Sequence, residues 1–240
     1  MKRLVLFDID GTLLHGGTLW RECFEGAFQA CFPDVVVKKV GFNGKTDPQI
    51  CHELMGEKPL AAAQAYAQTY AMSNSVQMIL DEYLDRVEKA LPTRANEVEA
   101  LPGTHDLLRE LSNIAGLQLG LLTGNVRRGA KIKLRAAKMD HFFDFGEYGA
   151  FGDDHWDRYC LPRIAASRAM KRDGIEYRGK EIVVIGDTIH DVNCGKSIGV
   201  RSIAVGTGRN VDRAELLAAQ PDHFFENLSD ISAVLHAISS

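Results

Sequence analysis

The sequence has no apolar run approaching the roughly 20 residues that a membrane-spanning helix needs. Its short apolar start, residues 4–7, is interrupted at once by Asp8 and Asp10, so we interpret it as a buried strand rather than a signal peptide. The chain also lacks an excess of positive charge, because its formal net charge is -4. Nucleic acid and anionic lipid therefore have no bulk electrostatic attraction to it, and we expect neither as a partner. A small anionic substrate would need a local positive site.

Cysteines are few and poorly spaced for a structural role. There are five of them, they are widely separated, and no Cys-x-x-Cys pair occurs. An odd and scattered set favours neither a disulfide framework nor a zinc site. We therefore expect reduced thiols in a cytoplasmic protein, which could be a monomer or a homodimer.

What the sequence does have is the composition of an ordinary globular protein, with 45% hydrophobic and 25% charged residues in a chain of 240. Several short apolar runs predict buried parallel strands, because near-continuous apolar character is typical of strands covered on both faces. These runs span residues 4–7, 117–122, 182–185 and 202–205. Helical patterns at 104–111 and 163–170 lie between the later runs. Alternating strands and helices predict an α/β protein with a doubly wound parallel sheet.

The stretch of residues 18–91 has a different character, because it contains no run typical of a strand. Asp47 and Pro48 predict a helix start, Pro59 predicts another, and the apolar spacing of residues 76–87 predicts an amphipathic helix. A helical module therefore interrupts the α/β protein after its first strand. The expected division is a helical domain of residues 17–92 inserted into an α/β core of residues 1–16 and 93–240.

Two carboxylates, Asp8 and Asp10, follow the first predicted strand with one residue between them. Ligands bind outside the carboxyl ends of the strands in an open α/β sheet, so both acids lie where a site is expected. Gly11 allows a close approach of the backbone, and exposed N–H groups there could hold phosphate oxygens. Alone, this pattern would favour a strand-end loop with two solvated acids.

A second predicted strand, residues 117–122, ends in Thr123, Gly124 and Asn125. A hydroxyl group and a backbone N–H at the start of a helix form a site for a phosphate oxygen. The same tripeptide is also a common turn and helix cap, so by itself it favours the structural interpretation.

A third predicted strand ends before Asp187 and Asp191. Their spacing of four residues places both acids on one face if the turn continues as a helix. Magnesium prefers hard oxygen ligands, which Asp8 and Asp187 could supply together with the backbone carbonyl of Asp10. Three such loops converge on one edge of one sheet, and this joint pattern is far more specific than any of its parts.

Together these motifs resemble those of the haloacid dehalogenase superfamily. The matching residues, in family order, are Asp8-x-Asp10-Gly11-Thr12, Thr123-Gly124-Asn125 and Gly186-Asp187-Thr188-x-x-Asp191. The resemblance covers essentially the whole chain, and residues 44–47 resemble a cap segment of the phosphoglycolate phosphatase-like members. It implies a Rossmann-like core, a mobile α-helical cap that closes over the site, and a phosphatase that depends on Mg²⁺.

The resemblance also implies catalytic roles. Asp8 would attack phosphorus and become an aspartyl phosphate, a covalent intermediate that divides one hard step into two. Asp10 would protonate the leaving group and then activate the hydrolytic water, while Thr123 would assist at the phosphoryl group. The phosphorylated substrate is expected to be a small metabolite.

The remaining implied residues bind the metal or the substrate. The metal residues are Asp8, Asp10, Asp187 and Asp191, of which Asp191 would hold metal-bound waters or the cation in place. The substrate-binding residues are Gly11, Thr12, Gly124, Asn125, Lys45 and Thr46.

The chain departs from the family pattern at the third motif, where many members carry a lysine that is often followed by proline. The expected stretch contains no Lys-Pro pair, and Arg158 is its best-placed cation. We predict that Arg158 replaces that lysine, because a guanidinium is always charged and can bind phosphate bidentately. The basic run at residues 127–138, which includes Lys131 and Lys133, is expected to be a solvated helix face.

Four other functions share parts of this pattern. A phosphosugar mutase uses the same core but must protect the aspartyl phosphate from water. A receiver-like phosphorylation switch also uses a metal-bound aspartate, but Asp10 and the large insert argue against it. Haloacid dehalogenation has no role for Asp10. Phosphonate hydrolysis requires a lysine that forms a Schiff base, for which Lys45 is the candidate.

Overall fold

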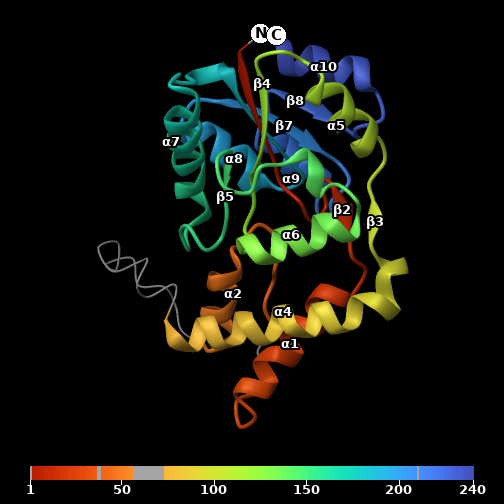
Figure 1. Ribbon diagram of the computed structural model, residues 1–240, viewed down its shortest axis with the longest axis vertical. Coiled ribbons are helices and arrows are strands. Elements are labelled where there is room, and N and C mark those ends of the chain that lie inside the picture. Colours follow the sequence, from red (N-terminus) through yellow and green to blue (C-terminus); the bar gives the residue numbers. More distant parts are fainter. Residues whose placement is uncertain (1, 37–38, 57–72, 210) are drawn as a thin grey trace.

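The computed structural model describes residues 2–36, 39–56, 73–209 and 211–240. In this part of the chain, six parallel strands form one sheet in the order β5-β4-β1-β6-β7-β8 (Figure 1). The strands are β1 (Arg3–Phe7), β4 (Leu117–Leu122), β5 (Gly149–Ala150), β6 (Ile182–Gly186), β7 (Arg201–Val205) and β8 (His223–Phe225). The four central strands coincide with the four predicted apolar runs, and the predicted doubly wound α/β fold is confirmed.

The helices cover both faces of this sheet. They are α5 (Thr104–Ser112), α6 (Arg127–Ala136), α7 (Leu161–Asp173), α8 (Ile189–Ser197), α9 (Arg213–Ala218) and α10 (Ile231–Ser239). Single 3₁₀ turns are η2 (Ala95–Glu97), η3 (Asp140–Phe142), η4 (Arg158–Cys160) and η5 (Gly179–Glu181). Because side chains alternate along a strand, Val5 and Phe7 pack with α5, α6 and α10, whereas Leu4 and Leu6 pack with α7 and α8.

The regular secondary structure in the described part of the insert is helical. Its helices are α1 (Leu19–Cys31), α2 (Asp47–Leu54) and α4 (Asn74–Arg94), and they lie below the sheet in Figure 1. Their apolar faces form one cluster, in which the Phe24 and Tyr83 rings lie 4.7 Å apart between centroids. The helix start predicted at Pro59 lies outside the described residues. The proposed domain boundaries stay a prediction.

Two short strands join the insert to the sheet domain. Strand β2 (Leu14–His15) leads into the insert and pairs in antiparallel register with β3 (Glu99–Ala100), which leads out of it. Both crossings of the chain are thus hydrogen-bonded to each other. In Figure 1, β1 runs from the N-terminus at the top down toward the insert, so the carboxyl edge of the sheet faces α1, α2 and α4. Among the helices described, none combines the length and apolar character needed to cross a membrane.

Candidate active site

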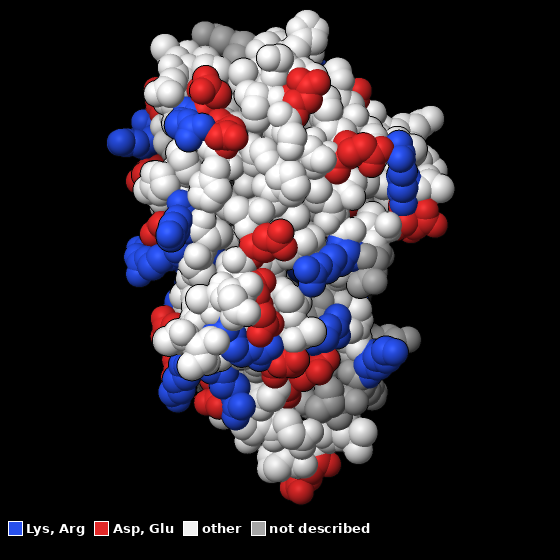
Figure 2. Space-filling view, turned by 90° about the vertical axis from the view of Figure 1, so that its right-hand side faces the viewer, with Lys and Arg blue, Asp and Glu red and all other residues white. Residues whose placement is uncertain are grey.

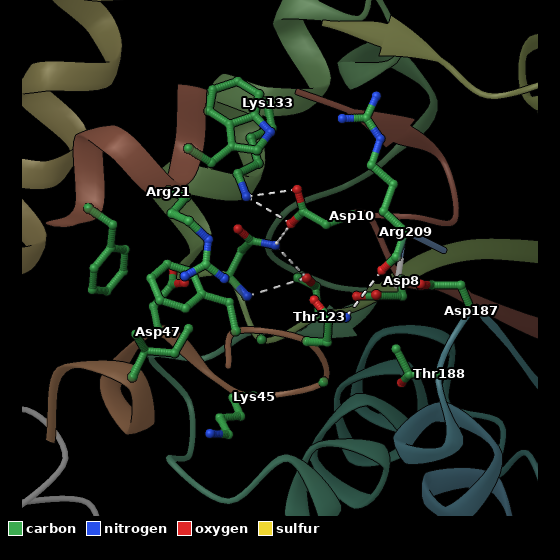
Figure 3. Close-up of a pocket in the computed structure, with 18 of the residues that line it drawn as sticks. Asp8, Asp10, Arg21, Lys45, Asp47, Thr123, Lys133, Asp187, Thr188 and Arg209 are labelled. Carbon is green, nitrogen blue, oxygen red and sulfur yellow. Dashed lines mark hydrogen bonds and ion pairs between the residues drawn. The ribbon is translucent and has the colours of Figure 1, made fainter. Parts of the chain in front are cut away.

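A cavity of about 230 Å³ opens between the carboxyl edge of the sheet and the helical insert (Figure 3). Asp8 and Asp10 reach it from the end of β1, and Thr123 from the end of β4. The insert supplies an aromatic wall and several polar groups, including Trp20, Arg21, Phe24, Phe42, Lys45, Asp47 and Tyr83. The three strand-end loops named from the sequence therefore meet at one cavity.

Arg158 lies at the floor of this cavity, beside Asp8. Its side chain is 5% exposed, and its Nη2 lies 3.1 Å from Asp8 Oδ1. The same nitrogen donates to Asp191 Oδ1 and thereby ties the 3₁₀ turn η4 to the start of α8. Its buried Nε has no hydrogen-bond partner among the described residues, which leaves one donor unsatisfied beside Asp8.

Three buried carboxylates surround this guanidinium. Oxygen atoms of Asp8, Asp187 and Asp191 all lie within 4.8 Å of one another. The pKa of Asp8 is raised to about 6, chiefly by burial; the charge of Arg158 opposes this shift, and the charges of Asp191 and Asp10 add to it. Burial and the charge of Asp8 likewise raise the pKa of Asp187 well above its usual value. When all three carboxylates are ionised, the charge of Arg158 offsets one of the three negative charges, and two remain to be balanced.

These groups fit a hard divalent cation. Carboxylate oxygens are the ligands that magnesium prefers, and two uncompensated negative charges match its charge. The backbone beside Asp187 leaves room because two glycines lie there. A Cβ on Gly11, whose φ is +87°, would lie 2.4 Å from Asp187 Oδ2, and a Cβ on Gly208 would lie 2.1 Å from the same oxygen. Thr12 donates to the other oxygen of Asp187 at 3.0 Å and orients the carboxylate.

Asp191 has less freedom to bind a metal. One carboxylate oxygen accepts from Arg158, and the other accepts from the backbone N–H and the hydroxyl of Thr188 at 3.0 and 2.7 Å. These bonds close the capping box of α8. The geometry therefore favours Asp191 as a support that holds Arg158 beside Asp8.

Asp10 is held from above by Lys133 and Asn125. Lys133 Nζ lies 2.9 and 2.7 Å from the two Asp10 oxygens, and Asn125 Nδ2 donates to Oδ2 at 2.7 Å (Figure 3). The expectation that Lys133 faces solvent is wrong, because its side chain is 6% exposed and points into the cavity. Lys131, on the same helix, is exposed as expected.

The second motif forms a contact surface for the insert. Asn125 donates to the Thr123 hydroxyl oxygen at 2.8 Å, which holds that side chain in the cavity floor. Gly124 accepts from the backbone N–H of Asp47 at 2.8 Å, and a Cβ on Gly124 would lie 2.0 Å from the Lys45 carbonyl oxygen. Gly124 is thus required by the close approach of the insert, a role that the sequence interpretation did not assign to it.

Of the two predicted substrate-binding residues in the insert, Lys45 and Thr46, only Lys45 lines the cavity, where it pairs with Glu53. Thr46 is fully buried, donates to the Trp156 carbonyl oxygen at 2.6 Å and caps α2 by accepting from Gln49. Its hydroxyl holds the insert against the sheet domain, so its geometry does not fit the predicted contact with substrate.

Several cavity residues were missed by the sequence analysis. Arg21 lies with its guanidinium 4.0 Å from the centroid of the Phe42 ring, and Arg209 enters from the loop after β7. Figure 3 shows these two arginines on opposite sides of Asp10. Asp47 accepts from the backbone N–H of Val126 at 2.8 Å, and its burial raises its pKa to about 6. The sequence predicts a helix start at Asp47 from the Asp-Pro pair, but this pattern does not indicate that Asp47 lines a cavity.

Charge on the outer surface is mixed. On the face drawn in Figure 2, Lys and Arg side chains are interspersed with Asp and Glu side chains among the described residues. That face presents no continuous basic area of the kind that nucleic acid requires. The cations concentrated at the cavity instead suit a small anion.

Comparison with known proteins gives consistent results. A family model described as haloacid dehalogenase-like hydrolase matches residues 5–205. The chain is 29% identical to phosphoglycolate phosphatase of Synechococcus elongatus over 62% of this chain and 65% of that protein, and so spans just under two thirds of it. It is 24% identical to pyrophosphatase PpaX of Bacillus cereus over 96% and 95% of the two chains. A hydrolase from Pseudomonas syringae has the same fold, with a TM-score of 0.67, 19% identity and full coverage of both chains.

Proposed function

The chain belongs to the haloacid dehalogenase-like hydrolase family, and we propose that it is a phosphatase that hydrolyses a small phosphomonoester through an aspartyl phosphate on Asp8. One observation carries this proposal: the buried Asp8 carboxylate faces the cavity with a guanidinium 3.1 Å away and a second acid, Asp10, two residues along the chain. A nucleophile, a cation for the transferring group and an acid–base group are thereby available at one place.

In the first step, an Asp8 oxygen attacks phosphorus, and the bond from phosphorus to the leaving oxygen breaks. Asp10 donates its proton to that oxygen, so the alcohol leaves neutral. Arg158 offsets the negative charge of the phosphoryl oxygens, and the Thr123 hydroxyl would donate to one of them. The product of this step is an aspartyl phosphate and an alcohol.

In the second step, water attacks the phosphorus of the aspartyl phosphate. Asp10, now ionised, takes a proton from this water, and the bond from phosphorus to the Asp8 oxygen breaks. Inorganic phosphate leaves, and Asp8 returns to its carboxylate form. Because Asp10 serves both steps, its position relative to Asp8 governs the whole cycle.

The proposal includes Mg²⁺ as the cofactor. Asp8 and Asp187 would hold it with their carboxylates and Asp10 with its backbone carbonyl, while Asp191 and Thr12 would orient this set. When bound, the ion would supply positive charge beside the phosphoryl oxygens. It would also balance the two negative charges that Arg158 leaves.

A phosphate-release screen tests the proposed function. Purified protein is incubated with Mg²⁺ and a panel of phosphorylated metabolites, with phosphoglycolate and inorganic pyrophosphate included because relatives carry those names. Steady release of phosphate from at least one monoester, without added sugar bisphosphate, is expected. Release that needs a bisphosphate would favour the mutase, and a phosphoryl-protein that persists without turnover would favour the receiver-like switch.

Magnesium is expected to stabilise the folded protein more at pH 7.5 than at pH 5. The folded-state pKa of Asp8 is raised from 3.8 to about 6 in the absence of metal, so below that pH the carboxyl is protonated and must lose its proton to become a ligand. The metal-free protein also loses stability as pH rises from the ordinary pKa of Asp8, 3.8, to its folded-state pKa of about 6. A bound cation removes this loss.

Urea unfolding with chelator or with Mg²⁺ at each pH measures the increment. Each increment is the difference between the free energies of unfolding with Mg²⁺ and with chelator at one pH, so the contributions of the other titrating groups cancel. The increment at pH 7.5 should be larger by roughly 2 kcal/mol. An increment that is equal at both pH values, or that survives in Asp187→Ala, would contradict the metal assignment.

Lys45→Ala is expected to change the order of preference among phosphomonoesters. Lys45 lines the cavity from the insert and pairs there with Glu53, so we expect it to act on the leaving group of the substrate rather than on the metal residues. We expect kcat/KM for an anionic leaving group to fall roughly tenfold, with little change for a neutral one. Lys89→Ala, at an exposed position on α4, is the matched control. If kcat/KM of Lys45→Ala fell by the same factor for every ester, Lys45 would not determine substrate specificity.

A further inference from the structure

Lys133 occupies an unusual place for a lysine. It lies on the buried face of α6, between Ala130 and Ala137, which are both buried. Its side chain is 6% exposed, whereas Lys131 two residues earlier is exposed. A buried ammonium costs several kcal/mol unless it is paired and hydrogen-bonded, so the fold retains this charge only together with its partner.

That partner is Asp10, which is held at both carboxylate oxygens. Lys133 Nζ lies 2.9 Å from Oδ1 and 2.7 Å from Oδ2, and Asn125 Nδ2 donates to Oδ2 at 2.7 Å. The Asp10 side chain is itself 39% exposed and stands on a loop. Without these donors its carboxylate would be free to rotate toward solvent, away from the leaving group.

The ammonium group of Lys133 is directed at Asp10 and at the Trp20 ring. It carries three donors, of which two serve the Asp10 oxygens. Its remaining side faces the Trp20 ring, with Nζ 5.1 Å from the ring centroid, a distance typical of a cation–π contact. Trp20 belongs to α1 of the insert, so the insert covers the pair.

We propose that Lys133 is a positioning residue for the reaction: it locks the Asp10 carboxylate in the orientation that transfers a proton to and from the reacting oxygens. This inference rests on the proposed phosphatase function. It assigns the ammonium to Asp10 and leaves Arg158 as the cation that serves Asp8. Small displacements of an acid–base group cost rate steeply, so removal of this clamp should slow the chemistry without weakening binding.

The test uses the dependence of rate on the leaving group. A 4-nitrophenolate ion leaves without protonation, whereas an alkoxide requires a proton from Asp10. Lys133→Met should therefore lower kcat/KM roughly 10- to 100-fold for the alkyl phosphate that the wild-type protein hydrolyses fastest, but by less than about threefold for 4-nitrophenyl phosphate. Met is apolar and of similar length, so it can pack beneath Trp20. Lys131→Met is the matched control and should match wild type with both esters.

A double variant shows whether Lys133 acts through Asp10. If it does, Asp10→Asn/Lys133→Met is no slower on the alkyl ester than Asp10→Asn alone. The double variant removes both charges of the pair, so it is a folded comparison even if Lys133→Met unfolds. Lys133→Arg should recover part of the alkyl-ester rate, because a guanidinium can also bind both oxygens.

The outcomes separate this inference from the proposed function. Equal losses with both esters, or losses that multiply in the double variant, would overturn the positioning role and leave the phosphatase intact. A folded Lys133→Met with unchanged alkyl-ester rate would also overturn it. If wild type releases phosphate from no ester at all, the proposed function itself fails.

Discussion

Asp8→Asn is expected to abolish phosphate release, with a loss of at least roughly 10,000-fold in kcat. An amide oxygen is a poor nucleophile, so the first bond to phosphorus does not form. The fold should survive, because Asn keeps the shape of the side chain and removes one of three crowded carboxylates. The raised pKa of Asp8, about 6, indicates that its ionised form is costly in the metal-free protein.

Steady-state phosphate release and thermal unfolding are measured together for this variant. We expect no activity and a metal-free unfolding temperature no lower than that of wild type. Asp106→Asn, at an exposed position on α5, is the matched control and should keep full activity. A folded Asp8→Asn protein with near-normal turnover would rule out the covalent mechanism.

Arg158→Ala is expected to lower kcat/KM roughly 100- to 1,000-fold, which is typical for the loss of one group that stabilises charge in a transition state. The guanidinium lies 3.1 Å from Asp8 and also holds Asp191, so its loss leaves buried carboxylates unpaired. That loss should also destabilise the protein by about 3–5 kcal/mol. Arg163→Ala, at an exposed position on α7, is the control and should change neither quantity.

Arg158→Lys separates catalysis from folding. An ammonium keeps the positive charge between Asp8 and Asp191 and should restore most of the stability. Its shorter reach and single point of charge should restore only part of the rate. Wild-type rates in a folded Arg158→Ala protein, measured as kcat/KM on the best monoester, would show that Arg158 has no part in phosphoryl transfer.

The central strands were predictable because burial on both faces makes each one a short apolar run. Strands β5 and β8 escaped prediction for the opposite reason. β5 has only the two residues Gly149 and Ala150, and the three residues of β8 are each partly exposed, so neither forms an apolar run. Their pairing depends on the neighbouring strands that they extend, which no local pattern records.

The sheet side of the site was predictable from chain order. Ends of parallel strands meet at one edge of the sheet, so Asp8, Thr123 and Asp187 could be brought together without knowing any side-chain orientation. Arg158 was predicted from the family resemblance, which implies a cation between Thr123 and Asp187 in chain order. The structure places its guanidinium beside Asp8, and its catalytic role is a proposal.

The insert side was not predictable in the same way. Whether Lys45 or Thr46 faces the cavity depends on how α2 docks against the sheet domain, and Thr46 turns to Trp156 instead. The prediction for Lys133 was wrong because every residue of the basic run was assigned to the exposed face of the helix. Helical periodicity instead places Lys133 on the same face as Ala130 and Ala137, which are buried.

The central claim is that a phosphoryl group passes through Asp8, and trapping it there is the most direct test. The Asp10→Asn variant is mixed with 4-nitrophenyl phosphate and Mg²⁺, quenched in acid and digested. With this leaving group Asp10 is not needed for formation of the intermediate but is needed for its hydrolysis, so the intermediate should accumulate. We expect one phosphoryl group on Asp8 in the peptide from Leu4 to Arg21, and none in the same peptide of Asp8→Asn/Asp10→Asn. Release of 4-nitrophenol without any phosphorylated peptide, or a phosphoryl group on another residue, would contradict this claim.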